Sequence, residues 1–281
     1  MSDPAPFDPA PFDPAPFDPA PSDPAPSDPA PSDPTPSDPV PSDPAAAASH
    51  VDAPLRLVVF DVDGTLIDSQ AFILAAMRRG FDAVGRAAPP DAAILSIVGL
   101  SLPEAVRRLA PDLPGPRAEA LVDAYRRAFR AQREDSGGEA ASPLYPGARA
   151  ALRRLAAQPA TLLGVATGKA RRGLDHALAA HGLDGLFQTL QTSDLHPSKP
   201  HPSMLQATLR DAGVEAGRAA MVGDSSYDMQ MARSAGLFAI GVAWGYHDAD
   251  ALRAAGAEAV IDRFEALDAV LDARLPRDAA A

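Results

Sequence analysis

Short apolar runs alternate with longer amphipathic segments, and this alternation restricts the fold more than any other feature of the chain. Five runs are predicted to be strands: 55–60, 161–166, 219–223, 237–243 and the shorter 258–261. Helical patterns lie near 147–157, 171–181, 201–212, 227–235, 248–255 and 264–273. Strands separated by helices of this length pair in parallel, with the helices as crossover connections. The expected fold class is therefore α/β, a doubly wound, Rossmann-like parallel sheet.

One long stretch interrupts the alternation. It contains helical patterns but no convincing strand, at 71–85, 103–109 and 117–133. We predict a helical cap domain at 70–143, inserted between two parts of a catalytic core, 51–69 and 144–281. The alternative is that these helices are simply further helices packed on the sheet.

The first 50 residues are predicted to be disordered. Residues 3–45 repeat a pentad in which every fifth position, from Asp3 to Asp43, is aspartate. These nine aspartates, with no Lys or Arg among them, provide most of the net charge of −12. Alternate prolines exclude helix and remove the donors that a sheet requires. We expect an extended, polyproline-like tail outside the fold.

Composition excludes several classes of protein and partner. The chain has no cysteine, which rules out disulfides, thiolate nucleophiles and Cys-ligated metals and fits the cytoplasm. No apolar run approaches the length of a membrane span, and no secretory signal is visible at the N-terminus. The acidic balance argues against nucleic acid as a partner. The oligomeric state is left open.

Polar side chains follow the predicted strands at the points where they end. Asp61, Asp63, Gly64 and Thr65 follow the first strand, Thr167 and Gly168 the second, and Asp224 and Asp228 the third, while Lys199 lies in a proline-rich loop. In open α/β sheets, ligands bind outside the carboxyl ends of the strands. We therefore expect these groups to meet at one edge of the sheet.

This combination of groups suits phosphoryl transfer. Converging carboxylates repel one another, and a hard divalent cation such as Mg²⁺ relieves that repulsion. Asp61 can attack phosphorus to form an aspartyl-phosphate, while Asp63 can protonate the leaving oxygen and later activate water. Thr167 and Lys199 can hold phosphoryl oxygens, and Gly64 allows a tight turn beside the phosphate. Positioning and charge neutralisation are what such a reaction requires.

Four motifs together resemble those of the haloacid dehalogenase-like hydrolase superfamily. They are "DVDGTL" at 61–66, the Thr of "VATGK" at 167, the Lys of "SKPHP" at 199 and "GDSSYD" at 223–228. Order and spacing match along roughly residues 55 to 270. Within that superfamily the chain looks most like members of the phosphoglycolate phosphatase type, which carry a helical cap after the first motif.

The resemblance implies a role for each motif residue. Asp61 would be the nucleophile and Asp63 the general acid/base. Asp61, Asp224 and the main-chain carbonyl of Asp63 would hold Mg²⁺, with Asp228 supporting them. The phosphate would be bound by Gly64, Thr65, Thr167, Gly168 and Lys199.

Three details bear on activity and substrate. Superfamily dehalogenases lack an acidic residue two places after the nucleophile, so Asp63 argues against dehalogenation. Many members carry Asn after the motif Thr, whereas this chain has Gly168, which leaves the substrate less certain than the chemistry. In the cap, Arg107 or Arg108 could attract an anionic substrate tail; the alternative is an exposed helix face.

The sequence thus predicts a cytoplasmic, Mg²⁺-dependent phosphatase acting on a small soluble phosphomonoester. Phosphoglycolate is the leading substrate, by resemblance. The alternatives are a sugar-phosphate mutase, a pyrophosphate or nucleotide hydrolase of the same superfamily, or a non-catalytic binding protein that acts through its acidic tail.

Overall fold

A parallel sheet forms the centre of the molecule. The computed structural model describes residues 54–135 and 142–276, so the predicted disordered tail lies outside the described residues. Six strands pair in the order β3-β2-β1-β4-β5-β6. They are β1 (Arg56–Phe60), β2 (Thr161–Thr167), β3 (Thr189–Thr192), β4 (Ala219–Gly223), β5 (Phe238–Val242) and β6 (Ala259–Ile261). All pairings are parallel, which confirms the predicted α/β class.

Helices cover both faces of this sheet, as the alternating pattern predicts. They are α5 (Ala148–Ala156), α6 (Arg171–Ala180), α7 (Ser203–Ala212), α8 (Ser226–Ala235), α9 (Ala249–Ala255) and α10 (Leu267–Arg274), with short 3₁₀ turns at Ala216–Arg218 and Phe264–Ala266. Because successive side chains of a strand point to opposite faces, β1 serves two cores. Val58 and Phe60 pack with α5, α6 and α10, whereas Leu57 and Val59 pack with α7, α8 and α9.

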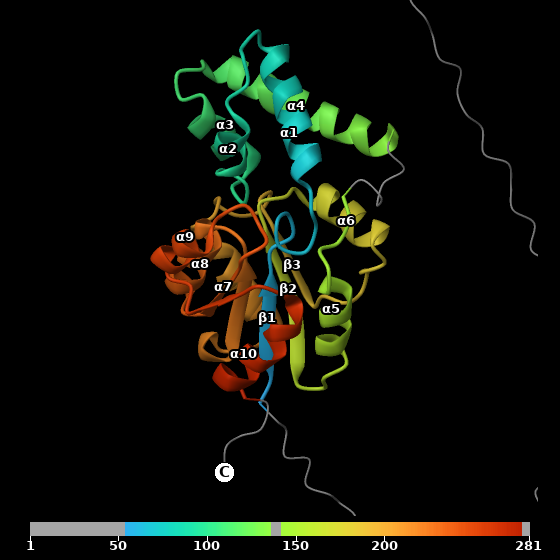
Figure 1. The fold of residues 1–281 in the computed structure, drawn as a ribbon, viewed down its shortest axis with the longest axis vertical. Helices are drawn as coiled ribbons and strands as arrows, with labels where there is room; N and C mark the ends of the chain where they lie inside the picture. Colours follow the sequence, from blue (N-terminus) through green and yellow to red (C-terminus); the bar gives the residue numbers. More distant parts are fainter. Residues whose placement is uncertain (1–53, 136–141, 277–281) are drawn as a thin grey trace, which may run out of the picture. The chain divides into compact units, whose positions relative to one another are not determined.

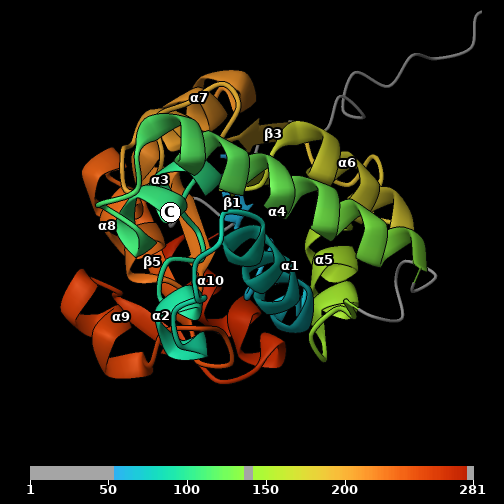
Figure 2. The same ribbon diagram turned by 90° about the horizontal axis from the view of Figure 1, so that it is seen from above.

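Four helices stand above the carboxyl ends of the strands (Figures 1 and 2). They are α1 (Gln70–Ala83), α2 (Asp91–Leu95), α3 (Leu102–Leu109) and α4 (Gly115–Asp135), and we call them the cap helices. They have a core of their own, in which Met77, Ile94 and Leu121 are almost fully buried. The described part of the predicted insert contains no strand, in agreement with the sequence pattern.

One strand was not predicted from the sequence. Strand β3 has the sequence TLQT, too polar to stand out as an apolar run. Two of its three buried polar side chains contact Asp211, whose Oδ2 accepts hydrogen bonds from Thr189 Oγ1 at 3.1 Å and from Gln191 Nε2 at 2.6 Å. The hydroxyl of the third, Thr192, has no hydrogen-bond partner among the described residues. A strand held at the sheet edge through a residue of α7 cannot be recognised from local hydropathy, because its partner is distant in sequence.

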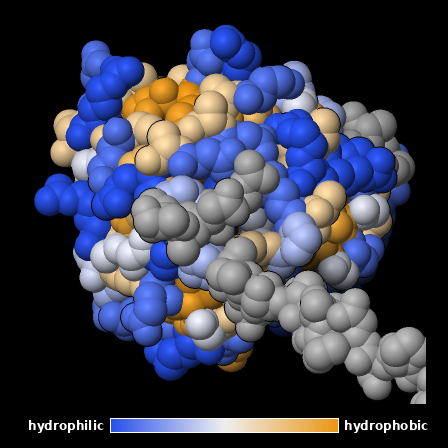
Figure 3. Space-filling model, turned by 90° about the horizontal axis from the view of Figure 1, so that it is seen from below, coloured by the Kyte–Doolittle hydropathy of each residue, from blue (hydrophilic) through white to orange (hydrophobic). Residues whose placement is uncertain are grey.

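The face away from the cap helices, seen from below, is mostly hydrophilic with small, separate apolar patches (Figure 3). Within the described ranges, no helix combines the length and apolar character needed to cross a bilayer. The cavity described next lies at the other end of the sheet, where the strands end beneath the cap helices.

Candidate active site

The order in which the chain adds strands to the sheet changes direction at β1. The chain adds β2 and β3 on one side of β1 and then returns to place β4 on the other side. Ligands of open α/β sheets bind at such a switch point. Here the three central strands deliver Asp61 after β1, Thr167 at the end of β2 and Asp224 after β4, and all three side chains are buried.

Three aspartates form a buried acidic cluster at this point. Carboxylate oxygens of Asp61, Asp224 and Asp228 lie within 4.8 Å of one another. Lys199 reaches the cluster from the loop between β3 and α7 and is itself 1% exposed. Its Nζ lies 2.9 Å from Asp61 Oδ2 and 2.7 Å from Asp228 Oδ1. The structure thus brings together four side chains that the sequence analysis placed in one site.

The oxygens of Asp61 differ in their contacts. Oδ1 accepts a hydrogen bond from the main-chain N–H of Val62 at 2.7 Å. Oδ2 is paired in charge with Lys199 but accepts no hydrogen bond of regular geometry. Apart from this lysine, no donor among the described residues contacts Oδ2, so the oxygen keeps a lone pair for nucleophilic attack.

The other two carboxylates are held by neighbouring donors. Asp224 accepts from Thr65 Oγ1 at 2.9 Å and from Tyr246 N at 3.0 Å. Asp228 Oδ2 accepts from Ser225 Oγ at 2.6 Å and from Ser225 N at 3.1 Å, in a capping box that begins α8. The hydroxyl of Thr65, predicted to bind phosphate, therefore supports the acidic cluster in this structure.

Gly64 makes the close approach of the first motif to Asp224 possible. Its φ of +84° lies in the left-handed region that favours glycine. A Cβ at this position would lie 2.3 Å from Asp224 Oδ2 and 2.6 Å from the Tyr246 ring. The Asp-Gly pair in the motif is thus explained by backbone conformation and by packing against the acidic cluster.

Burial and mutual repulsion shape the electrostatics of the cluster. Burial raises the pKa of Asp61 to about 6; Lys199 opposes this rise, and Asp228 adds to it. Burial, Asp228 and Asp61 together raise the pKa of Asp224 well above its usual value. Burial disfavours the charged form of Lys199, but Asp228 and Asp61 overcome this and raise the pKa of its ammonium. One lysine thus faces three carboxylates, and the cluster is short of positive charge.

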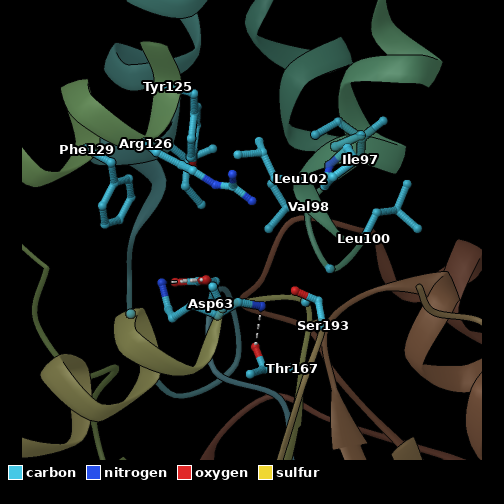
Figure 4. A pocket seen from close by; sticks show the side chains of 18 of the residues that line it. Asp63, Ile97, Val98, Leu100, Leu102, Tyr125, Arg126, Phe129, Thr167 and Ser193 are labelled. Carbon is cyan, nitrogen blue, oxygen red and sulfur yellow. Dashed lines mark hydrogen bonds and ion pairs between the residues drawn. The ribbon is translucent and has the colours of Figure 1, made fainter. Parts of the chain in front are cut away.

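Asp63 lies apart from the acidic cluster and faces the cavity (Figure 4). Ser69 Oγ donates to its Oδ1 at 2.5 Å, and Lys169 Nζ lies 2.8 Å from its Oδ2. Lys169 Nζ also lies 5.1 Å from the ring centroid of Phe129 on α4. Lys169 therefore links Asp63 to a cap helix, a contact that the sequence analysis did not anticipate because its partners come from three separate segments.

The structure explains why Gly168 stands at the position where many family members carry Asn. A Cβ at this position would lie 2.5 Å from the main-chain oxygens of both Gly99 and Leu100. Neither an Asn side chain nor an Ala methyl group fits while this loop between α2 and α3 lies so close. The preceding Thr167 is buried, and its Oγ1 accepts from Lys169 N at 3.3 Å.

A cavity of about 410 Å³ lies between these residues and the cap helices. Asp61, Asp63, Thr167 and Gly168 contribute to its lining on the side of the sheet. The cap contributes mostly apolar and aromatic side chains, with three arginines: Ile73, Met77, Ile97, Val98, Leu100, Leu102, Pro103, Ala105, Tyr125, Arg126, Phe129, Arg130 and Arg133. The sequence analysis did not predict the cavity residues from α4. Their spacing, which places them on one face of the helix, is the signal that could have identified them.

The two cap arginines considered from the sequence do not line this cavity. Arg107 and Arg108 both pair with Glu104 on their own helix, at 2.7 and 2.9 Å. Arg108 also donates to Tyr227 Oη at 3.1 Å, across to α8. These contacts favour the alternative interpretation, in which α3 presents an exposed charged face.

The residues of the acidic cluster fit a divalent cation. Asp61, Asp224 and Asp228 would hold it, because their carboxylate oxygens lie within 4.8 Å of one another and share a single lysine. Mg²⁺ prefers carboxylate oxygens together with water and phosphate. When bound, it would supply the positive charge that the cluster lacks and would neutralise phosphoryl oxygens.

Comparisons with known proteins agree with this geometry. The family model for haloacid dehalogenase-like hydrolase matches residues 58–242, which include all four motifs. The chain belongs to the haloacid dehalogenase-like hydrolase family. The family and the hydrolase class expected from the motifs are thereby confirmed.

Relatives and solved structures cover most of this hydrolase. The protein named Probable phosphatase IndB, from Dickeya dadantii (strain 3937), is 36% identical over 74% of this chain and 90% of its own length. A plasmid-encoded phosphoglycolate phosphatase of Cupriavidus necator is 33% identical over 79% of this chain and 95% of its own. A hydrolase from Pseudomonas syringae has a TM-score of 0.68 at 24% identity, over 76% of this chain and 97% of that one, which supports the fold alone.

Proposed function

We propose that this protein is a Mg²⁺-dependent phosphatase that hydrolyses a small phosphomonoester through an aspartyl-phosphate on Asp61. The hydrolase class follows from the family. The observation that carries the mechanism is the state of Asp61 Oδ2. This oxygen accepts no regular hydrogen bond, lies 2.9 Å from Lys199 Nζ, and belongs to a residue that lines the cavity.

The reaction proceeds in two steps. In the first, Asp61 Oδ2 forms a bond to phosphorus while the bond from phosphorus to the substrate oxygen breaks. Asp63 gives its proton to that leaving oxygen. In the second step, Asp63 takes a proton from a water molecule whose oxygen attacks phosphorus, and the bond between phosphorus and Asp61 Oδ2 breaks to release inorganic phosphate. Asp61 and the protonated Asp63 are then restored.

The remaining residues bind and orient. Lys199 balances the negative charge that spreads over the phosphoryl oxygens in the transition state. Thr167 holds a phosphoryl oxygen through its hydroxyl group. Ser69 and Lys169 keep the carboxyl group of Asp63 directed along the cavity. Fixing an acid/base group in this way lowers the entropic cost of reaching the reactive geometry.

Phosphoglycolate is the leading candidate substrate, and the names of the relatives support it. The related protein of Cupriavidus necator is named phosphoglycolate phosphatase, as is another from Vibrio cholerae that is 29% identical over 219 residues. We assign the cap to 70–143 and the catalytic core to 51–69 and 144–281, with the cap covering the bound substrate. The cytoplasm is the proposed location, on the composition alone.

The test is phosphate release from a panel of small phosphomonoesters, with Mg²⁺ and with EDTA. Asp61→Asn is nearly isosteric but cannot form the acyl phosphate, so we expect turnover to fall by at least about 10³-fold. Asp175→Asn, which changes an exposed aspartate of α6, serves as the matched control and should retain activity. EDTA should abolish release. Activity that persists in Asp61→Asn would overturn the assignment of the nucleophile.

The mutase alternative is separated by products. A sugar-phosphate mutase returns an isomeric hexose phosphate without net release of inorganic phosphate. Incubation with hexose phosphates, followed by product analysis, therefore distinguishes the two activities. Isomerisation without phosphate release would replace the phosphatase proposal.

A further inference from the structure

The cavity is larger than a phosphoryl group and a two-carbon acid require. Its volume of about 410 Å³ falls within the range of sites that enclose a larger organic ligand. Between the catalytic aspartates and the outer part of α4, the walls are apolar, with contributions from Ile97, Val98 and Leu102. Figure 4 shows these three side chains facing Tyr125 and Phe129 across the cavity. Such walls favour an apolar or ring-shaped body in the substrate.

Three arginines on one face of α4 add positive charge to this cavity. Arg126, Arg130 and Arg133 occupy positions i, i+4 and i+7, which share a helix face, and all three line the cavity. Arg172, in the first turn of α6, lines it as well. In Figure 4 the side chain of Arg126 extends from α4 into the cavity beside Tyr125.

The carboxylates of the site leave these arginines without strong partners. Asp61 and Asp63 are paired with the two lysines of the site. Asp194, the third carboxylate in the lining, accepts a hydrogen bond from the main-chain N–H of Arg171 at 2.5 Å. Arg126 has one weak ion pair, to Asp123 at 3.5 Å, in which both side chains are about half exposed. Within residues 54–135 and 142–276, no carboxylate forms an ion pair with Arg130. The guanidinium groups of Arg126 and Arg130 therefore keep hydrogen-bond donors available for a ligand.

The positive charge of these arginines is opposite in sign to the net charge of the whole chain. The chain carries a net charge of −12, yet guanidinium groups gather around the cavity. Local charge in a concave site attracts ligands of the opposite sign and raises their local concentration. Arginine is also suited to bidentate recognition of carboxylates and phosphates.

We propose that the substrate carries a second anionic group, separated from the transferred phosphoryl group by an apolar body, and that Arg126 and Arg130 bind this second group. The inference rests on the proposed phosphatase function and narrows its substrate class. It favours a phosphomonoester larger than phosphoglycolate, the candidate that the names of the relatives suggest. A carboxylate and a second phosphate share the required chemistry. The second anion lies against α4, while the phosphoryl group lies at Asp61.

The test uses two aryl phosphates of matched shape, one with a distal carboxymethyl group and the other with the neutral carboxamide. Wild-type protein should show a kcat/KM that is higher by about tenfold or more for the carboxylate, as expected for a charge-assisted contact. The Arg126→Gln, Arg130→Gln double variant should reduce this ratio to near one, mainly by raising KM for the carboxylate.

Arg127→Gln provides the matched control. Arg127 lies on the same helix between the two residues, is exposed, and does not line the cavity. Its substitution should leave the ratio of the two kcat/KM values unchanged. Replacing the carboxylate with a phosphonate in a third probe distinguishes a preference for carboxylate from one for any anion.

The outcomes separate this inference from the function on which it rests. Equal kcat/KM for the carboxylate and the carboxamide, with no change in the double variant, would overturn the anion subsite and leave the phosphatase intact. A fall in the ratio in Arg127→Gln as large as in the double variant would also overturn it. Failure of the wild-type protein to release phosphate from any probe or from phosphoglycolate would overturn the phosphatase proposal, and the subsite would fall with it.

Discussion

Two aspartates separated by one residue have very different surroundings. Asp61 is buried in the acidic cluster, where Lys199 contacts its Oδ2, whereas Asp63 faces the cavity and contacts Ser69 and Lys169. In the proposed mechanism the buried Asp61 is the nucleophile, and Asp63, on the cavity side, is the acid/base group. Since the two residues lie so close in sequence, this difference comes from the segments that fold against them.

At Gly168 the core and the loop between α2 and α3 approach closely, since a Cβ here would lie 2.5 Å from the main-chain oxygens of Gly99 and Leu100. The φ of Gly168 is not in the left-handed region, so an alanine here is acceptable to the backbone, and only space opposes it. We expect Gly168→Ala to displace the loop at Gly99 and Leu100 and to lower kcat/KM by about tenfold, because small misplacements near the reacting groups are costly.

Steady-state kinetics on the preferred phosphomonoester would measure this effect. Gly217→Ala is the control, since a Cβ at that position meets no atom within 4 Å. Its kinetics should match those of the wild type. Unchanged kinetics in Gly168→Ala would mean that the loop does not need its close approach for turnover.

At the scale of elements, β1 carries a buried charge that the apolar pattern conceals. Arg56 is 0% exposed at the amino end of the strand. Its guanidinium donates to Asp272 Oδ1 at 2.7 Å and to the carbonyl of Leu275 at 3.0 Å, which ties α10 to the sheet. It also donates to Gln158 Oε1 at 2.8 Å and to Thr161 Oγ1 at 3.0 Å, beside β2. One side chain thus joins α10, β1 and the start of β2 at the amino end of the sheet.

We expect Arg56→Met to lower the free energy of unfolding by about 2–3 kcal/mol. The change leaves several polar groups without their donor, although Asp272 is 38% exposed and water compensates part of the loss. Urea denaturation followed by circular dichroism measures it. Arg154→Met removes an exposed pair with Asp268 and should cost less than about 1 kcal/mol. Equal effects in the two variants would contradict the structural role of Arg56.

At the scale of the whole molecule, charge is divided between the repeats and the site. Nine of the net negative charges come from the aspartates of residues 3–45, whereas the cavity is lined by several cations. If the protein is an enzyme that acts through Asp61, the repeats are not needed for turnover. If it is a binding protein that acts through the repeats, they are essential.

Deletion of residues 1–50, with an initiating methionine before residue 51, separates these two functions. We expect kcat/KM for the preferred phosphomonoester to stay the same as in the full chain. Loss of all turnover in the shortened protein, with its circular dichroism unchanged, would contradict this expectation and assign a catalytic role to the repeats.

The sequence by itself determined the fold class, the strand-free helical stretch that follows the first strand, and the groups at the strand ends. Those features depend on local chemistry: hydrophobic period, turn residues and the spacing of motifs. Asp61, Thr167, Lys199 and Asp224 could be assigned to one site because parallel strands end at the same edge.

Only the tertiary structure decided which residues of the catalytic core contact residues of the cap helices. The pairing of Lys169 with Asp63, the lack of space at Gly168 and the place of Arg126 in the cavity all join segments far apart in sequence. The same holds for β3, where Thr189 and Gln191 donate hydrogen bonds to Asp211 of α7. Local patterns record how each segment folds, but contacts between distant segments arise only when the cap helices and the sheet pack together.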